Sequence, residues 1–476
     1  MPSNKRDKNN KNTNTSTKFK KLSIQMTSFK KKNKHNSLSK KRFSLKPGKT
    51  IKNSSYISSN FPAFFQKNFS LRSANLQQNM YPKLKTTHRS YYPSQKRIIV
   101  IGDVHGDLDK LIDCLKIGKC INSDLSLPPP DERSDATMFK FFNDIEWIGE
   151  DTYVVQVGDQ IDRIRPTNWD KNQVAIGATS RDEGSSLHIF YLLWYLNMIA
   201  KTVGGRVISL MGNHEYMNVD GDFRYVSPNE FKEYYNAFHK FYNGTIRPDE
   251  DDIKIINRVK EEHRNLENVP QGYIERRIAY NPSGIIANFF GINYKMVVQI
   301  GSWVFVHAGL TMNMCSNTNI CKINNAISRY MITKNVDKKD KKLYNKTLPK
   351  DDAIYQRFIN CRGDKSPVWC RDFGDDIEDP REEKILNGKF HLLLEEYNRS
   401  NKSYHQKYGI PTAKYVAVGH TPQFHNAKGI NSICYGKMWR CDVGMSRAFG
   451  SCQNGDTTRC PQVLEVLNDN TINILM

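Results

Sequence analysis

The chain has 476 residues, with 71 Lys and Arg against 49 Asp and Glu, which gives a formal net charge of +22. Residues 1–100 hold 24 of these basic residues and a single acid, Asp7, so they carry +23 and the rest of the chain carries −1. The composition therefore excludes a uniformly basic protein and indicates a near-neutral body that follows a basic N-terminal segment.

No stretch of the sequence predicts a membrane span or a secretory leader. The longest apolar run, Ile189–Ala200, has 12 residues, whereas a span needs about 20, so a buried helix is expected there. The first 30 residues lack the apolar segment of a signal peptide. The ten cysteines lie from Cys114 onward without a C-x-x-C pair. We therefore expect reduced thiols in a soluble intracellular protein, with nucleus or cytoplasm left open.

Residues 1–90 are rich in Lys, Asn and Ser and show no sustained hydrophobic period, so we expect a disordered basic extension. Two features interrupt it. The clusters in Lys30–Arg42 resemble a two-part nuclear-import signal and equally suit nucleic acid or an anionic membrane surface. The aromatic patch Phe61–Phe69 suits docking on the body or on a partner. A solvated extension without a specific partner is the alternative to these interpretations.

The ordered body is predicted to begin at Lys96. Five short, apolar, β-branched runs predict buried strands, namely Arg97–Gly102, Tyr153–Gly158, Arg206–Gly212, Trp303–His307 and Tyr415–Gly419. Helical patterns lie between them, at Asp107–Ile117, where Asp107 is a candidate N-cap, and at Ser185–Ala200. This alternation predicts an α/β fold with packed sheets. Stretches at about 120–146, 163–184 and 234–283 are predicted insertions.

Each predicted strand ends in polar residues. The strand-end motifs are G-D-V-H-G at 102–106, G-D-Q-I-D-R at 158–163, G-N-H-E at 212–215, H-A-G at 307–309 and G-H-T at 419–421. Ligands bind at the carboxyl ends of strands in α/β sheets. Carboxylate, amide and imidazole groups together suit two divalent cations such as Mn²⁺, Fe or Zn²⁺. Each motif is weak by itself, but the five in this order predict a metal centre.

In this order, the five motifs resemble those of the phosphoprotein-phosphatase branch of the metallophosphoesterases. Four longer segments are similar to the Shewanella-like protein phosphatases, and they are Trp147–Asp162, Gly204–Val226, Ser366–Arg371 and Trp439–Ser446. The resemblance covers roughly residues 96–450. It implies an α/β (α+β) fold, a calcineurin-like β-sandwich flanked by helices, in a catalytic domain that spans residues 96–470.

The resemblance also implies a role for individual residues. The implied metal ligands are Asp103 and His105 for one ion, Asn213, His307 and His420 for the other, and Asp159 as the bridge between them. Hydroxide activated by the two metals would attack phosphorus directly. His214 would protonate the leaving group, and Asp162 would orient the ring of His214. Arg163, Asn213 and Arg371 would bind the phosphoryl oxygens.

Two positions depart from the family pattern. Ile164 stands where the family usually has the glycine of D-R-G, and Ala308 replaces the usual glycine of H-G-G. Because isoleucine disfavours the positive φ that glycine permits, we expect the loop that carries Arg163 to sit differently. The change at Ala308 is expected to be tolerated. Arg224 is a weaker candidate for phosphate binding, for which a structural ion pair is at least as good an interpretation.

The resemblance implies a metal-dependent protein phosphatase that hydrolyses phosphomonoesters on phosphoproteins. The same site would also serve a dinucleoside-polyphosphate hydrolase or a nucleic-acid phosphodiesterase. A nucleic-acid-binding protein with a vestigial metal site is a third hypothesis, which the intact ligand set disfavours. The Shewanella-like segments favour the phosphatase over the second hypothesis. The sequence leaves open phosphoserine and phosphothreonine against phosphotyrosine, the physiological substrate and the oligomeric state.

Overall fold

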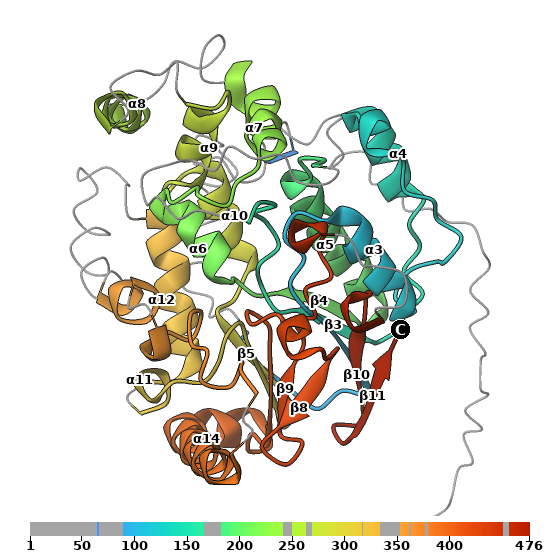
Figure 1. Cartoon of the computed structure of the whole chain (residues 1–476), viewed down its shortest axis with the longest axis vertical. Coiled ribbons are helices and arrows are strands. Elements are labelled where there is room, and N and C mark those ends of the chain that lie inside the picture. Colours follow the sequence, from blue (N-terminus) through green and yellow to red (C-terminus); the bar gives the residue numbers. More distant parts are fainter. Residues whose placement is uncertain are drawn as a thin grey trace, which may run out of the picture. The chain divides into compact units, whose positions relative to one another are not determined.

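The computed structural model describes residues 64–65, 89–165, 182–240, 250–262, 269–316, 318–333, 353–360, 363–376, 379–450 and 457–476. All of these residues belong to one unit, which spans Ser54–Met476. Its centre is formed by two β-sheets, around which helices pack (Figure 1). The predicted sandwich of sheets flanked by helices is therefore confirmed.

The first sheet has the strand order β11-β10-β2-β3-β4. Its strands are β2 (Arg97–Ile101), β3 (Tyr153–Gln156), β4 (Arg206–Ser209), β10 (Val463–Leu467) and β11 (Thr471–Leu475). Strand β3 lies parallel to both β2 and β4, whereas β10 is antiparallel to β2 and to β11. Because β2, β3 and β4 are parallel, their carboxyl ends lie at one edge of the sheet.

The second sheet has the strand order β1-β5-β6-β7-β9-β8. Its strands are β1 (Tyr91–Tyr92), β5 (Val297–Ile300), β6 (Trp303–Val306), β7 (Tyr415–Val418), β8 (Asn431–Ile433) and β9 (Met438–Arg440). Strands β6, β7 and β9 are parallel to one another, whereas β5 runs antiparallel to β6 and β8 antiparallel to β9. The ends of β6 and β7 therefore also meet at one edge.

The five predicted strands are β2, β3, β4, β6 and β7, and each begins at the predicted residue. Each ends one to three residues earlier than predicted, because the last predicted residues, which include the apolar Val157, Leu210 and Met211, already belong to the following loop. Their central residues are buried, as the apolar β-branched composition predicts.

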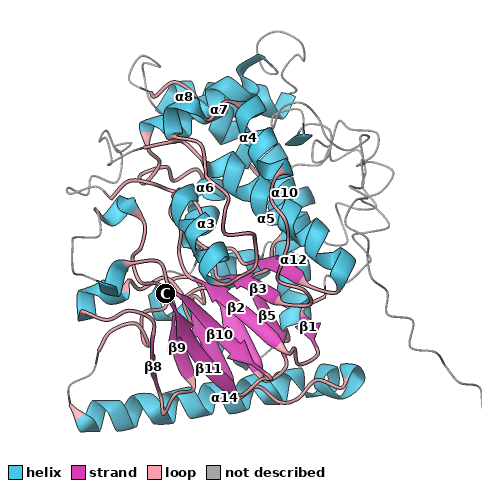
Figure 2. Cartoon of the chain, turned by 90° about the vertical axis from the view of Figure 1, so that its right-hand side faces the viewer, coloured by secondary structure: helices cyan, strands magenta, loops and turns pink. Residues whose placement is uncertain are grey.

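The helices are α3 (Leu108–Ile117), α4 (Asp135–Asn143), α5 (Ser186–Ala200), α6 (Asn213–Asp220), α7 (Pro228–Lys240), α8 (Glu250–Glu262), α9 (Tyr273–Tyr280), α10 (Ile285–Asn293), α11 (Met312–Cys315), α12 (Ile320–Thr333) and α14 (Pro380–Tyr408). Helix α5 packs on β4, and α12 contacts β5. Helix α14 runs across one end of the strands, on the opposite side from α7 and α8 (Figure 2). The predicted N-cap of α3 is confirmed, since Asp107 accepts a hydrogen bond from the Lys110 N–H at 3.4 Å.

Two residues of the predicted disordered extension belong to the hydrophobic core. The ring of Phe64 lies 4.9 Å from Tyr191 and 4.6 Å from Trp194 on α5, measured between ring centroids. Phe65 is fully buried and lies 5.3 Å from Phe289 on α10. Disorder over all of residues 1–90 was therefore too broad a prediction, because aromatic burial orders this point of the chain. The basic clusters in Lys30–Arg42 lie outside the described residues.

The predicted insertions differ in how much of each is described. Helix α4 lies within 120–146, and residues 166–181 of the second insertion are outside the described residues. The third, 234–283, supplies the end of α7 together with α8 and α9. A separate apolar cluster lies there and in the segment just before it, formed by Phe223, Val226, Phe231, Val259 and Tyr273. The third predicted insertion thus shares a small second core with the segment that precedes it.

Eight of the cysteines lie in the described part of the chain. Seven of these side chains are buried. Among the helices of the described residues, none combines the length and the apolar character that a membrane crossing requires.

Candidate active site

The ends of strands from both sheets meet at one place. His307, at the end of β6, places Nδ1 3.0 Å from the carbonyl oxygen of Val157, which follows β3. The backbone N–H of His420, after β7, donates to Oδ2 of Asp103, after β2, at 2.9 Å. The predicted strand-end motifs are thus brought together by hydrogen bonds between the two sheets.

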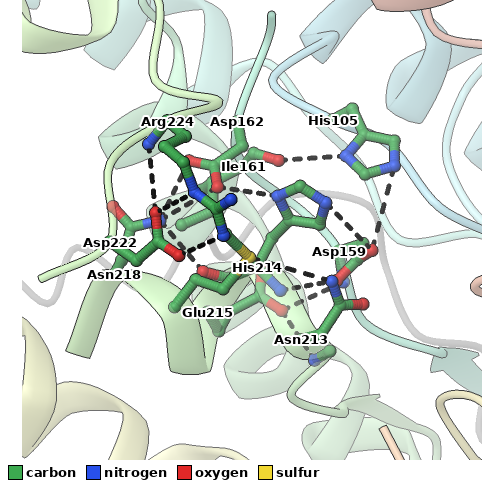
Figure 3. A network of polar contacts seen from close by, with 12 residues as sticks. His105, Asp159, Ile161, Asp162, Asn213, His214, Glu215, Asn218, Asp222 and Arg224 are labelled. Carbon is green, nitrogen blue, oxygen red and sulfur yellow. Dashed lines mark hydrogen bonds and ion pairs between the residues drawn. The ribbon is translucent and has the colours of Figure 1, made fainter. Parts of the chain in front are cut away.

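Asp159 lies at the centre of the gathered side chains. Its Oδ2 is 3.9 Å from Nε2 of His105 (Figure 3). Its Oδ1 is 3.3 Å from Nε2 of His307. Two groups of candidate metal ligands share this carboxylate, Asp159 with His307 and His420, and Asp159 with His105 and His214. Asp159 therefore lies between the two groups, at the place where a bridging ligand is predicted.

The remaining two predicted ligands lie beside these groups. Oδ2 of Asp103 is 4.0 Å from Nε2 of His105, and Oδ1 of Asn213 is 2.9 Å from Nε2 of His307. Nδ1 of His307 donates to a backbone carbonyl, so its Nε2 faces the oxygens of Asn213 and Asp159. Burial lowers the pKa of His307, but the carboxylate of Asp159 outweighs it and raises the pKa, and a metal ion at Nε2 would take the place of that proton. Three electron-pair donors that face one another suit a cation between them.

Buried atoms without hydrogen-bond partners also fit a metal centre. Oδ1 of Asp103, Nε2 of His420 and Oδ2 of Asp442 are buried and make no hydrogen bond within the described part of the chain. Burial and the carboxylates of Asp442 and Asp159 hold the pKa of Asp103 well above its usual range. Burial lowers the pKa of His105 and His420, so both rings are neutral, the form that binds metals. This donor set fits two divalent cations.

Backbone strain is concentrated at these residues. His105, Asp159, Asp162 and His420 have φ values of 45°, 52°, 72° and 70°. Left-handed conformations are uncommon for residues other than glycine, and they persist where the surroundings enforce them. The backbone also approaches Asp159 closely at Gly212, where a Cβ would lie 2.0 Å from Oδ1 of Asp159, so only glycine fits there. The loops are therefore held in a costly arrangement that aims their side chains at one point.

Two buried glutamates hold these loops together. Glu215 accepts hydrogen bonds from the N–H groups of Asp159 at 3.0 Å, Gln160 at 2.8 Å and Gly212 at 2.6 Å. Glu230 accepts from the N–H groups of Asp162 at 3.0 Å and Arg163 at 2.9 Å. Each glutamate occupies the first turn of a helix, α6 or α7, and so fixes the loop after β3 to that helix.

His214 and Asp162 form a buried pair beside the metal ligands. Nδ1 of His214 lies 2.7 Å from Oδ2 of Asp162, and its Nε2 lies 3.8 Å from Oδ2 of Asp159 (Figure 3). Asn218 donates to both carboxylate oxygens of Asp162, at 2.9 Å and 3.1 Å. Nδ1–H therefore points to Asp162, and Nε2 faces the candidate metal site.

The predicted phosphate-binding arginines occupy different surroundings. Arg163 is buried, and its guanidinium contacts Oδ2 of Asp107 at 2.8 Å and Oε2 of Glu183 at 3.4 Å. Its role in phosphate binding stays a prediction that these ion pairs do not favour. Arg371 is exposed and donates to Oγ1 of Thr421 at 3.4 Å, next to His420. Arg224 pairs with Asp222, which bears out the structural interpretation.

The two departures from the family pattern are accommodated. Ile164 is absent from the described residues with positive φ, and its N–H donates to the carbonyl of Tyr225 at 2.9 Å. The left-handed residue of this loop is Asp162, so the loop does not require glycine at position 164. The N–H of Ala308 donates to the carbonyl of Pro367 at 2.9 Å, and its methyl group is buried.

Comparison with known proteins identifies the family. The model of the calcineurin-like phosphoesterase family matches residues 96–424. The chain belongs to this family. Shewanella-like protein phosphatase 2 of Arabidopsis thaliana is 28% identical over 393 residues, which cover 81% of this chain and 78% of that protein. Shewanella-like protein phosphatase 1 of Plasmodium berghei is 25% identical, with coverage of 76% and 72%. Among solved structures, a cold-active protein tyrosine phosphatase matches with 18% identity, coverage of 83% and 82%, and a TM-score of 0.44.

These comparisons confirm the predicted resemblance, including its Shewanella-like character, and the chain is a phosphoesterase of the calcineurin-like type. This family uses divalent metals, and the structure holds matching groups of candidate ligands. No role was predicted for Glu215, Glu230 and Asp442, nor for Arg276, whose Nε donates to Oδ1 of Asn218 at 2.8 Å. Ser227-x-x-Glu230 is a capping-box sequence that could have identified Glu230, whereas Arg276 lies in an insertion without any motif.

Proposed function

We propose that this chain is a metal-dependent phosphomonoesterase that acts on phosphoproteins. The observation that carries the proposal is the convergence of five further ligand side chains around Asp159, with the His214–Asp162 pair directly beside them. Asp103 and His105 would hold one ion, and Asn213, His307 and His420 the other. Two bound divalent ions supply an activated water and stabilise charge on the phosphoryl oxygens.

The chain's own residues have separate tasks in this proposal. His214 donates the proton at Nε2 to the leaving oxygen, while Nδ1–H remains hydrogen-bonded to Asp162. Asp162 keeps the ring in that orientation and stabilises the imidazolium, and Asn218 fixes Asp162 in turn. Asn213 and Arg371 bind phosphoryl oxygens from the side of the second ion. Arg371 is exposed, so it lies where a protein substrate approaches.

Phosphoproteins are the proposed substrates because two relatives, which cover 81% and 76% of the chain, are named protein phosphatases. The test compares phosphoserine, phosphothreonine and phosphotyrosine peptides, a phosphodiester and a dinucleoside polyphosphate, each with Mn²⁺ and after chelation. We expect Mn²⁺-dependent hydrolysis of at least one phosphopeptide, above the rates on the diester and the dinucleotide. Faster cleavage of the diester or the dinucleotide would contradict the proposal.

A matched pair of variants keeps this assay specific. His214→Asn removes the proposed proton donor, whereas His391→Asn changes a histidine of α14 whose side chain is 72% exposed. The first variant should lose phosphopeptide hydrolysis and the second should retain it.

A further inference from the structure

Arg165 is a cation at the candidate site that no carboxylate neutralises. Its Nη1 donates to the carbonyl oxygens of Asp162 at 3.0 Å and Ile164 at 2.8 Å. Among the described residues, no Asp or Glu oxygen lies within 4.0 Å of its guanidinium. Arg163 and Arg276, by contrast, each contact a carboxylate. Arg165 therefore lies beside the metal ligands without a direct ion pair to a described carboxylate.

Two aromatic rings hold the guanidinium of Arg165 in place. Its Cζ lies 4.5 Å from the ring centroid of Phe449 and 5.4 Å from that of Tyr225. The ring of Phe449 in turn lies 5.5 Å from His105, and the ring of Tyr225 lies 4.6 Å from His214. Cation–π contacts on both sides restrict the side chain without using its N–H donors. The rings of Phe449 and Tyr225 thus hold the charge of Arg165 near His105 and His214.

The chemistry of this position suits a phosphoryl group. Nε and Nη2 of Arg165 donate no hydrogen bond to the described residues, and an arginine fork binds phosphate oxygens well. Burial lowers the pKa of Arg165, while the nearby carboxylates of Asp159, Asp162 and Asp442 act in the opposite direction. In the loaded protein Asp159 would be engaged by the metals, and Asp162 is already held by His214 and Asn218, which leaves the guanidinium for an anionic substrate.

We propose that Arg165 binds a non-bridging oxygen of the substrate's phosphoryl group, in the role that the sequence analysis assigned to Arg163. The inference rests on the proposed phosphatase function. In the segment D-R-I-R the first arginine stabilises the fold through Asp107 and Glu183, and the second faces the site. The phosphate-binding arginine of this chain is thus Arg165, two residues after Arg163, which is the arginine of the G-D-Q-I-D-R motif.

The test measures phosphate binding to the Mn²⁺-loaded full chain, as the inhibition constant of inorganic phosphate against an aryl phosphate and as its dissociation constant by calorimetry. Arg165→Ala should weaken phosphate binding by about 10- to 100-fold, the loss expected for a hydrogen bond to a charged group. Arg165→Lys, which keeps the charge and is the fallback if the alanine variant does not fold, should lose less. Arg381→Ala, at a side chain 92% exposed, should match the wild type.

Manganese content and melting temperature separate this role from a structural one. Arg165→Ala should leave the manganese content unchanged and should lower the melting temperature less than Arg163→Ala, which removes a cation that pairs with the buried carboxylates of both Asp107 and Glu183. Wild-type phosphate affinity in Arg165→Ala, or loss of bound manganese in that variant, would overturn the proposal. If the wild type hydrolysed no phosphate ester, the proposed function would fail, while calorimetry would still decide whether Arg165 binds phosphate.

Discussion

Arg276 lies directly behind the His214–Asp162 pair, so changing it should affect proton donation without touching the substrate. Its fully buried guanidinium places Nη2 3.5 Å from Oδ1 of Asp162, and its Nε donates to Oδ1 of Asn218 at 2.8 Å. The rings of Tyr234 and Tyr280 lie 4.7 Å and 4.9 Å from its Cζ. Arg276 thus holds Asp162, which accepts the Nδ1–H hydrogen bond of His214, and it also holds Asn218, whose amide donates to Asp162.

The size of the effect follows from these contacts. Removing the cation breaks a buried ion pair, which costs about 3–5 kcal/mol, and the amide oxygen of Asn218 loses a partner, at about 1–3 kcal/mol. Because whole domains are stable by only about 5–15 kcal/mol, Arg276→Met is expected to fold poorly. Arg276→Lys keeps the charge and loses the fork, so its free energy of unfolding should fall by about 1–3 kcal/mol.

The kinetic consequence is a selective loss. A less firmly held Asp162 orients His214 less well, and an alkoxide leaving group depends on protonation more than a nitrophenolate does. We expect kcat of Arg276→Lys on a phosphoserine peptide to fall about tenfold more than kcat on p-nitrophenyl phosphate, a part of the 10²- to 10⁴-fold that general acid catalysis supplies. Urea unfolding gives the stability change, and steady-state kinetics gives the two kcat values.

Arg258→Lys is the matched control, because Arg258 is an exposed arginine of the same predicted insertion. It should leave the free energy of unfolding and both kcat values unchanged. If Arg276→Lys lost the same factor on both substrates, or nothing on either, the reasoning that links Arg276 to His214 would be refuted.

Three further predictions concern the metals, the acid and the core. Asp159→Asn should lower the Mn²⁺ content and reduce aryl phosphate hydrolysis by at least about 100-fold; wild-type rates after metal exchange would show that Asp159 does not link two ions. His214→Asn should lose about 10²- to 10⁴-fold on a phosphoserine peptide and less on an aryl phosphate, and equal losses would argue against the proton donor. Phe65→Ala should lower the free energy of unfolding by about 3–5 kcal/mol, because Phe65 is fully buried. A protein that starts at Ser54 should keep the wild-type free energy of unfolding, and one that starts at Tyr91 should show the same loss as Phe65→Ala. If both truncated proteins were as stable as the wild type, Phe65 would not belong to the folding unit.

The gathering of the candidate metal ligands was predictable, because the pattern that predicts each strand and the pairing of the parallel strands both place these residues at one edge. Apolar β-branched runs predict buried strands, and parallel strands bring their carboxyl ends together. Asp103 and Asp159 therefore had to lie close once β2 and β3 paired, and the motifs after β4, β6 and β7 extended the set. Each of these inferences needs only the residues of one strand and the loop that follows it.

The arginines could not be assigned from sequence, because their roles depend on distant partners. Arg163 and Arg165 are separated by one residue, yet the contacts that distinguish them come from Asp107, Glu183 and Phe449. Arg276 reaches the site from a helix whose sequence contains no motif. Such contacts arise from tertiary packing, for which a single sequence carries no period and no spacing signal.

The extension was misjudged in part for a different reason. Averaged over residues 1–90, the composition predicts disorder, whereas the aromatic patch Phe61–Phe69 within it was expected to dock on the body or on a partner. Phe64 and Phe65 bury enough apolar surface to order their own part of the chain against α5 and α10.

The central claim is that two divalent ions share Asp159 within one site. Anomalous diffraction at the manganese edge from Mn²⁺-loaded crystals tests it most directly. The account predicts two peaks about 3.5–4 Å apart, one beside His105 and Asp103 and one beside His307 and His420. A single peak, or peaks away from Asp159, would contradict it.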